Sequence, residues 1–137
     1  MNDDNCNEAK VVLIEFMNAM NAWELKFYPL FRNEGRANHE DKAKEELTEI
    51  FERWCHPTSG SRDRLVAINC SEPPEYEIDG RTITACSEIG SVVVCDITQT
   101  TGLKSKFKFS LKKTKTGWKV AKKERGRYDG KWQVGGF

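Results

Sequence analysis

The chain has 137 residues, with 22 Lys and Arg against 21 Asp and Glu, which gives a formal net charge of +1. This length predicts a single domain over residues 1–137 that buries its own core, and we expect the polar residues 1–7 to be disordered. No apolar run approaches the roughly 18 residues of a membrane-spanning helix. The acidic start MNDDNCNEAK is unlike the basic start of a secretory signal.

The five cysteines form an odd count and contain no CxxC spacing, which favours a reducing, cytoplasmic setting. The charges are also divided along the chain. Residues 1–100 carry a net charge of −9 and residues 101–137 a net charge of +10. Such a division would steer a charged partner, unless the two halves lie side by side and neutralise each other.

The first half of the chain has the period of amphipathic helices. A first helix is expected from about Glu8 to Tyr28, and it should end or kink at Pro29, which lacks an amide hydrogen. Its apolar stripe consists of Leu13, Phe16, Met20, Trp23 and Phe27. A second helix should begin near Asn38, as its N-cap, and stop before Pro57. Its stripe consists of Ala43, Leu47, Ile50, Phe51 and Trp54.

From Arg64 onward the apolar period changes to two, which indicates strands. The expected strands are Arg64–Ser71, Tyr76–Ile78, Arg81–Ile89, Ser91–Thr100, a lysine-rich strand around Phe107 to Leu111, and Trp118–Arg125. Asp79-Gly80 is a hairpin signal, and the residues from Asp129 on read as a short tail. Two helices followed by an antiparallel meander predict an α+β fold, in which a twisted, curved sheet packs on the N-terminal helices as a cone.

Two chemical roles can be considered for single residues, an acid–base carboxylate and a metal ligand. A carboxylate in an apolar pocket beside the first helix would act as a base, and Trp23, Glu24 and Asp96 are the pocket candidates. The competing interpretation places Glu24 at the stripe edge and Asp96 on an outward sheet face. His39 and His56 have no partner at a ligand spacing, so neither a metal nor another cofactor is expected.

A nucleic-acid interface would combine the lysines after position 103 with nearby aromatic rings. The rings in question are Phe107, Phe109, Trp118, Tyr128 and Trp132. Strand alternation, however, puts Phe107 and Phe109 on the face opposite the lysines. Rings and charges then do not share a surface, which argues against nucleic acid as the partner.

Five segments together carry a resemblance to a known family. They are FMNAMNAWELKFYPLFR at 16–32, EELTEIFERWC at 45–55, SEPPEYEIDG at 71–80, TQTTGLKSKFKFSLKKTKTGWKVAKKE at 98–124 and DGKW at 129–132. In their order and spacing the chain resembles the immunity proteins of bacterial polymorphic toxin systems that have the nuclear-transport-factor-2-like fold. The resemblance implies a small, non-enzymatic cytoplasmic protein that binds the C-terminal domain of a cognate toxin and blocks it. It implies no catalytic residues.

Two surfaces would serve such binding. The first is the wet side of the second helix, formed by Glu45, Glu46, Glu49 and Glu52, which would mask a cationic toxin site. The second is the lysine face with Tyr128 and Trp132. We favour the acidic surface, although an ordinary solvated helix face has the same pattern. The alternatives to an immunity protein are a small-molecule-binding or hydrolytic enzyme of the same fold and a nucleic-acid-binding module. A homodimer is also compatible with the sequence.

Overall fold

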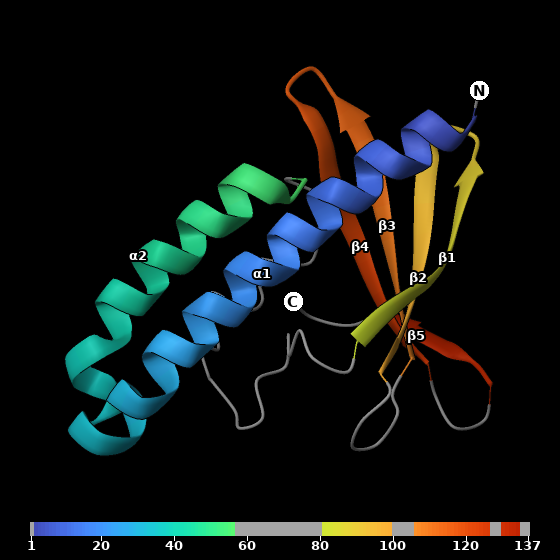
Figure 1. Ribbon diagram of the computed structural model, residues 1–137. Coiled ribbons are helices and arrows are strands. Elements are labelled where there is room, and N and C mark those ends of the chain that lie inside the picture. The colour runs from blue at the N-terminus through green and yellow to red at the C-terminus, as the bar shows by residue number, and fades with distance from the viewer. Residues whose placement is uncertain (1, 57–80, 100–105, 127–129, 135–137) are drawn as a thin grey trace.

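The computed structural model describes residues 2–56, 81–99, 106–126 and 130–134 (Figure 1). These residues form two helices, α1 (Asn2–Glu34) and α2 (Arg36–Trp54), and five strands. The strands are β1 (Arg81–Ile89), β2 (Val92–Gln99), β3 (Lys106–Thr114), β4 (Gly117–Gly126) and β5 (Trp132–Val134). The two helices pack against a curved antiparallel sheet, so the α+β prediction is confirmed.

Helix α1 is longer at both ends than the sequence predicts. It begins at Asn2, so residues 2–7, which we expected to be disordered, belong to the helix. Side-chain contacts with distant strands hold this end, since Asn5 Nδ2 donates to Glu88 Oε1 at 3.1 Å. Trp118 Nε1 likewise donates to Glu8 Oε2 at 3.1 Å. These partners lie too far away in the sequence for a local pattern to reveal them.

Of the two outcomes expected at Pro29, an end or a kink, the end is wrong, because the helix continues to Glu34. Proline removes one helical hydrogen bond and crowds the preceding turn. Two contacts at helical spacing span the proline and favour continuation. The rings of Phe27 and Phe31 lie 5.9 Å apart, and Arg32 Nη1 donates to the Tyr28 hydroxyl at 2.9 Å.

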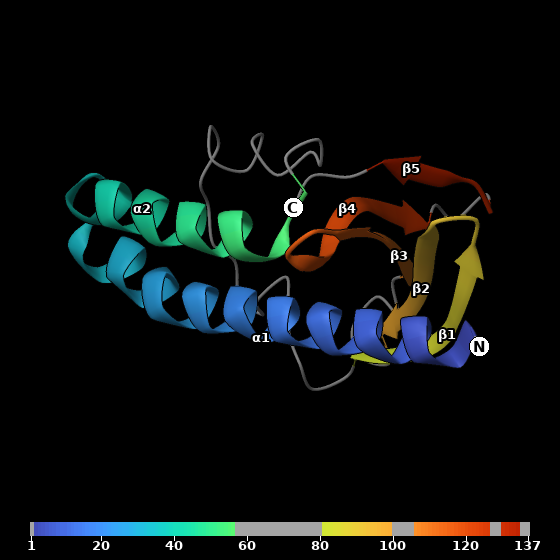
Figure 2. The same ribbon diagram turned by 90° about the horizontal axis from the view of Figure 1, so that it is seen from above.

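The chain reverses at Gly35, whose φ of 90° is a backbone conformation that glycine adopts most readily. Helix α2 then runs back beside α1 from Arg36 (Figure 2). The expected N-cap, Asn38, is therefore wrong. Asn38 lies inside α2, and its side-chain amide donates to the Glu34 carbonyl at 2.6 Å, which joins the start of α2 to the end of α1.

The sheet is the predicted antiparallel meander, with strand order β1-β2-β3-β4-β5. A register shift between Ser110 and Leu111 marks an irregularity in the pairing of β3 with β4. The expected tail contains a strand, β5, which pairs with the end of β4. The strands predicted at 64–71 and 76–78, and the Asp79-Gly80 turn, lie outside the described residues.

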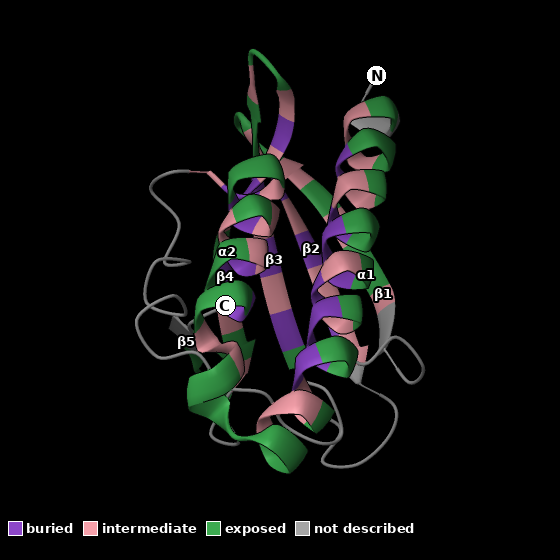
Figure 3. Cartoon of the chain, turned by 90° about the vertical axis from the view of Figure 1, so that its left-hand side faces the viewer, coloured by how far each residue is buried: buried purple, intermediate pink, exposed green. Residues whose placement is uncertain are grey.

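The core lies between one face of the sheet and the helices, where the buried surfaces of both meet (Figure 3). Both predicted helical stripes face it, although Ile50 and Trp54 are only partly buried. On β2 and β3 the buried positions alternate with more accessible ones, as predicted. The inward residues of these strands are Val93, Cys95, Ile97, Phe107, Phe109 and Leu111. Charged side chains on the opposite face therefore cannot join a site beside α1.

The four described cysteines are free, and two of them, Cys55 and Cys95, are buried. Burial raises the pKa of both thiols above the usual value, because a thiolate would lose its hydration. Burial also raises the pKa of Cys6, with a further contribution from the nearby Cys86. The two buried thiols, Cys55 and Cys95, are neutral at physiological pH and serve as small apolar groups of the core.

This neutral burial predicts a loss of stability in alkali. The folded pKa of Cys55 lies above its ordinary value of 9.0, so the unfolded chain gives up the Cys55 proton first. The contribution of the neutral Cys55 thiol to the free energy of unfolding is therefore fully present below about pH 9 and declines as the pH rises further. When the pH rises from 8 to 10, the free energy of unfolding should fall in both proteins. We expect the fall to be about 1 kcal/mol smaller for Cys55→Ala than for the parent protein. Urea denaturation at both pH values measures this, and parallel pH profiles would contradict it.

Candidate functional site

The four predicted carboxylates of α2 form two groups, which differ in the side of the helix on which they lie. Glu45, Glu49 and Glu52 are exposed, because the apolar stripe of α2 turns the opposite side toward α1 and the sheet. We call these three residues the acidic face. Glu46 is only half-buried and points toward α1, where its carboxylate lies 2.7 Å from the Lys26 ammonium. The predicted set of four carboxylates thus consists of three exposed side chains, of which Glu45 lies 3.8 Å from the Lys42 ammonium, and one half-buried side chain paired with Lys26.

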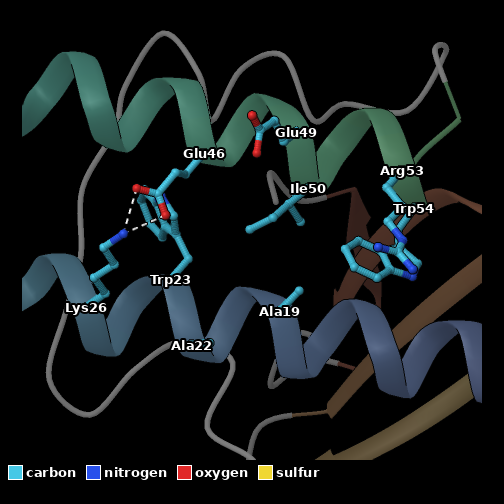
Figure 4. Close-up of a pocket in the computed structure, with 9 residues that line it drawn as sticks. All are labelled: Ala19, Ala22, Trp23, Lys26, Glu46, Glu49, Ile50, Arg53 and Trp54. Atoms are coloured by element: carbon cyan, nitrogen blue, oxygen red, sulfur yellow. Dashed lines mark hydrogen bonds and ion pairs between the residues drawn. The ribbon is translucent and has the colours of Figure 1, made fainter.

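A groove of about 300 Å³ lies between α1 and α2 beside the acidic face (Figure 4). We call it the interhelical groove. Its lining residues are Ala19, Ala22, Trp23, Lys26, Glu46, Glu49, Ile50, Arg53 and Trp54. The volume is at the lower end of the range for small-molecule sites, about 300–1,000 Å³. Its size suits one or two side chains.

Tryptophans flank the groove near both of its ends. Near one end the Trp23 indole donates to the Ala43 carbonyl at 2.9 Å, and Lys26 holds Glu46 beside it. Near the other end the Arg53 guanidinium lies 4.6 Å from the centre of the Trp54 ring. The small side chains of α1 leave the space between them (Figure 4).

The structure does not bring the three pocket candidates together. Trp23 lines the interhelical groove, but Glu24 does not, and it is fully buried on α1. Asp96 lies on the outer face of the sheet, because its neighbours Cys95 and Ile97 occupy the buried face. Since α1 packs on that buried face, Glu24 and Asp96 do not form a carboxylate pair for acid–base chemistry.

The second predicted surface is only partly described. Tyr128 lies outside the described residues. Trp132 is 36 % exposed, and Lys108 places its ammonium 4.3 Å from the centre of the ring, so one ring face is used within the protein. Phe107 and Phe109 are buried, as the alternation predicted, and bases cannot stack on them. The structure gives the nucleic-acid alternative no aromatic platform on β3.

The histidines and acidic residues of the described ranges offer no metal site. His39 Nε2 lies 3.4 Å from Glu34 Oε1, an interaction near the turn between the helices. Across residues 2–56, 81–99, 106–126 and 130–134, no group of three or more His, Cys, Asp or Glu is placed to hold a metal ion.

Sequence reasoning missed several residues that shape this region. It treated Ile50 and Trp54 only as core and gave no role to Ala19, Ala22 or Arg53. A signal was present, since two alanines three residues apart on one helix face leave room beside a partner helix. Reasoning also missed Lys123, which is 2 % exposed and lies over the Phe107 ring at 5.3 Å.

The described residues thus form an α+β protein with a charged helix surface and a small groove between its two helices. Comparison with known families identifies the class of protein, because the model of NTF2 fold immunity proteins matches residues 8–136. The chain belongs to this family, which neutralises toxins, and its partner is a cognate toxin.

A curated relative supports the same assignment. The chain is 41 % identical over 128 residues to Immunity protein RhsIA from Dickeya dadantii (strain 3937), and the match covers 92 % of this chain and 93 % of the relative. No solved structure gives a significant match. Among the described residues, neither helix is long and apolar enough to cross a membrane.

The groove geometry predicts unequal costs for two substitutions. Trp23→Phe removes a buried indole hydrogen bond and leaves a void between the helices, so we expect a loss of about 1–3 kcal/mol in unfolding free energy. Lys26→Met removes a partly exposed ion pair and should cost less than about 1 kcal/mol. Urea denaturation of both variants measures the difference. An equal or larger loss for Lys26→Met would contradict this account of the groove.

Proposed function

We propose that this immunity protein blocks the C-terminal domain of its toxin by direct contact through the acidic face of α2, without catalysis. The observation that carries the proposal is the exposure of three carboxylates, Glu45, Glu49 and Glu52, on a helix whose other side is fixed in the core. A rigid, negatively charged helix surface complements a cationic active site such as that of a nuclease.

The distribution of charge over the fold supports this orientation. The acidic face lies on α2, which extends past the sheet together with the end of α1 (Figure 1). The exposed lysines of β3 and β4, among them Lys106, Lys112 and Lys122, lie on the sheet instead. Helix α2 also carries exposed Lys42, Lys44 and Arg53, but Glu49 and Glu52 form no ion pair among the described residues. A cationic toxin approaching α2 would meet attraction, while the lysines would disfavour its approach to the sheet.

Blocking the toxin by direct contact also accounts for a non-enzymatic role. Occlusion needs shape and charge complementarity and no reacting group. The separation of Glu24 from Asp96 supports this reading. We further propose that the protein acts in the cytoplasm, where the thiols of its core stay reduced. One copy of the chain presents the whole acidic face, so the mechanism does not depend on the homodimer, which light scattering would detect.

The proposal predicts protection of cells by co-expression. Cells that produce the C-terminal domain of the cognate toxin, whose gene we expect beside this one, should grow when this chain is present and should die without it. An unrelated toxin domain provides the specificity control and should kill in both cases. Colony counts measure the outcome. Death despite abundant, folded protein would refute direct neutralisation.

The choice of surface predicts an asymmetry between two triple variants. Reversal of Glu45, Glu49 and Glu52 to Lys should abolish protection, because three like charges would then face the cationic toxin. Reversal of Lys106, Lys112 and Lys122 to Glu changes an equal number of charges on the sheet and should leave protection intact. Growth assays and circular dichroism of both variants measure protection and folding. The opposite pattern would place the interface on the sheet.

A further inference from the structure

The interhelical groove borders the acidic face but has a different chemical character. Ala19 and Ala22 of α1 and Ile50 of α2 give it an apolar floor, and its indole rings add to this surface (Figure 4). An apolar floor of this kind favours the methylene stem of a long side chain, which loses its contact with water there.

One carboxylate on the rim of this groove is available to a partner. Glu46 is already held by Lys26, which donates to both of its oxygens at 2.8 and 2.7 Å. Glu49 is exposed and also lines the groove. In the described part of the chain no ion pair involves Glu49. The groove thus combines an apolar floor with a carboxylate that forms no ion pair, while its second cation, Arg53, lies against the Trp54 ring.

We infer that the interhelical groove receives a long basic side chain, arginine or lysine, projecting from the toxin. The inference rests on the proposed function and names the contact that would anchor it. The stem of the side chain would lie on Ala19, Ala22 and Ile50, and its cationic head would reach Glu49. Lysine and arginine are the side chains that bury a methylene stem and keep a charged end at the rim.

The volume and the position of the groove agree with such an occupant. About 300 Å³ is small for a free metabolite but sufficient for one or two side chains. The groove lies between the two helices, and Glu49 belongs both to its rim and to the acidic face. A toxin surface covering the acidic face would therefore pass over the opening. A side chain inserted there would be a central, desolvated anchor of the kind that dominates binding energy.

The test uses purified full-length protein and an inactivated C-terminal domain of the cognate toxin, with Kd measured by calorimetry. Glu49→Gln removes the charge at the rim, and its control Glu52→Gln makes the same change outside the groove. Ala22→Phe fills the groove, and its control Asn18→Phe adds the same ring one turn earlier on exposed α1. We expect both groove variants to raise Kd about tenfold or more and both controls to change it less than about threefold.

A double-mutant cycle identifies the anchor on the other side. Each surface Arg and Lys of the toxin domain is replaced by Met in turn. One of these replacements should raise the Kd of the complex with the parent protein and should leave the Kd of the complex with Glu49→Gln unchanged. Circular dichroism confirms that each variant is folded. Groove variants that bind as tightly as their controls would overturn the inference, and so would equal losses in all four variants.

Failure of this inference is distinguishable from failure of the proposed function. If the triple reversal of the acidic face abolishes binding while Glu49→Gln and Ala22→Phe do not weaken it, the interface stands and the groove is empty. If the triple reversal also leaves binding unchanged, the acidic face itself is not the interface. Weaker binding of the two groove variants alone would support the groove as the anchor.

Discussion

The architecture depends on one constraint, which is that α1 is longer than the sheet on which it packs. Its 33 residues span about 50 Å, whereas strands of eight to ten residues are about 30 Å long. The apolar stripe of α1 continues beyond the part that the sheet covers, and Trp23 and Phe27 need burial there too. Helix α2 packs against this stretch and completes the core. The turn at Gly35 makes this cover possible.

This solution creates the surface on which recognition would occur. Two helices side by side leave a furrow wherever the facing side chains are small, and Ala19 and Ala22 occur at such a place. The solvent side of α2 has no packing role, so Glu45, Glu49 and Glu52 can be charged at little cost to folding. The sheet acts mainly as a scaffold that fixes both helices. The candidate surface thus lies at the edge of the fold, where charge is tolerated.

Sequence patterns predicted the parts of the fold that depend on period. The helical stripe from Leu13 to Phe27 and the alternation around Phe107 and Phe109 are each set by local geometry, and both face the core as expected. Helix ends were mispredicted because distant partners decide them. The start of α1 is held by Glu88 and Trp118, more than 80 residues away. For the groove, Ala19 and Ala22 indicate room on one side of α1, but its size depends on how closely α2 approaches, which no local pattern sets.

The carboxylates show why a single sequence separates site residues from surface residues poorly. Asp96 shares its parity with Val92 and Val94, and its face could be assigned only once Cys95 and Ile97 were known to be buried. Glu24 and Glu45 are the same residue type on neighbouring helices, yet one is fully buried and the other is exposed. Exposed positions such as Glu45 tolerate substitution within about 0.5 kcal/mol, whereas buried ones do not. An immunity protein whose contacts lie on exposed helix positions can therefore change its toxin specificity without losing its fold.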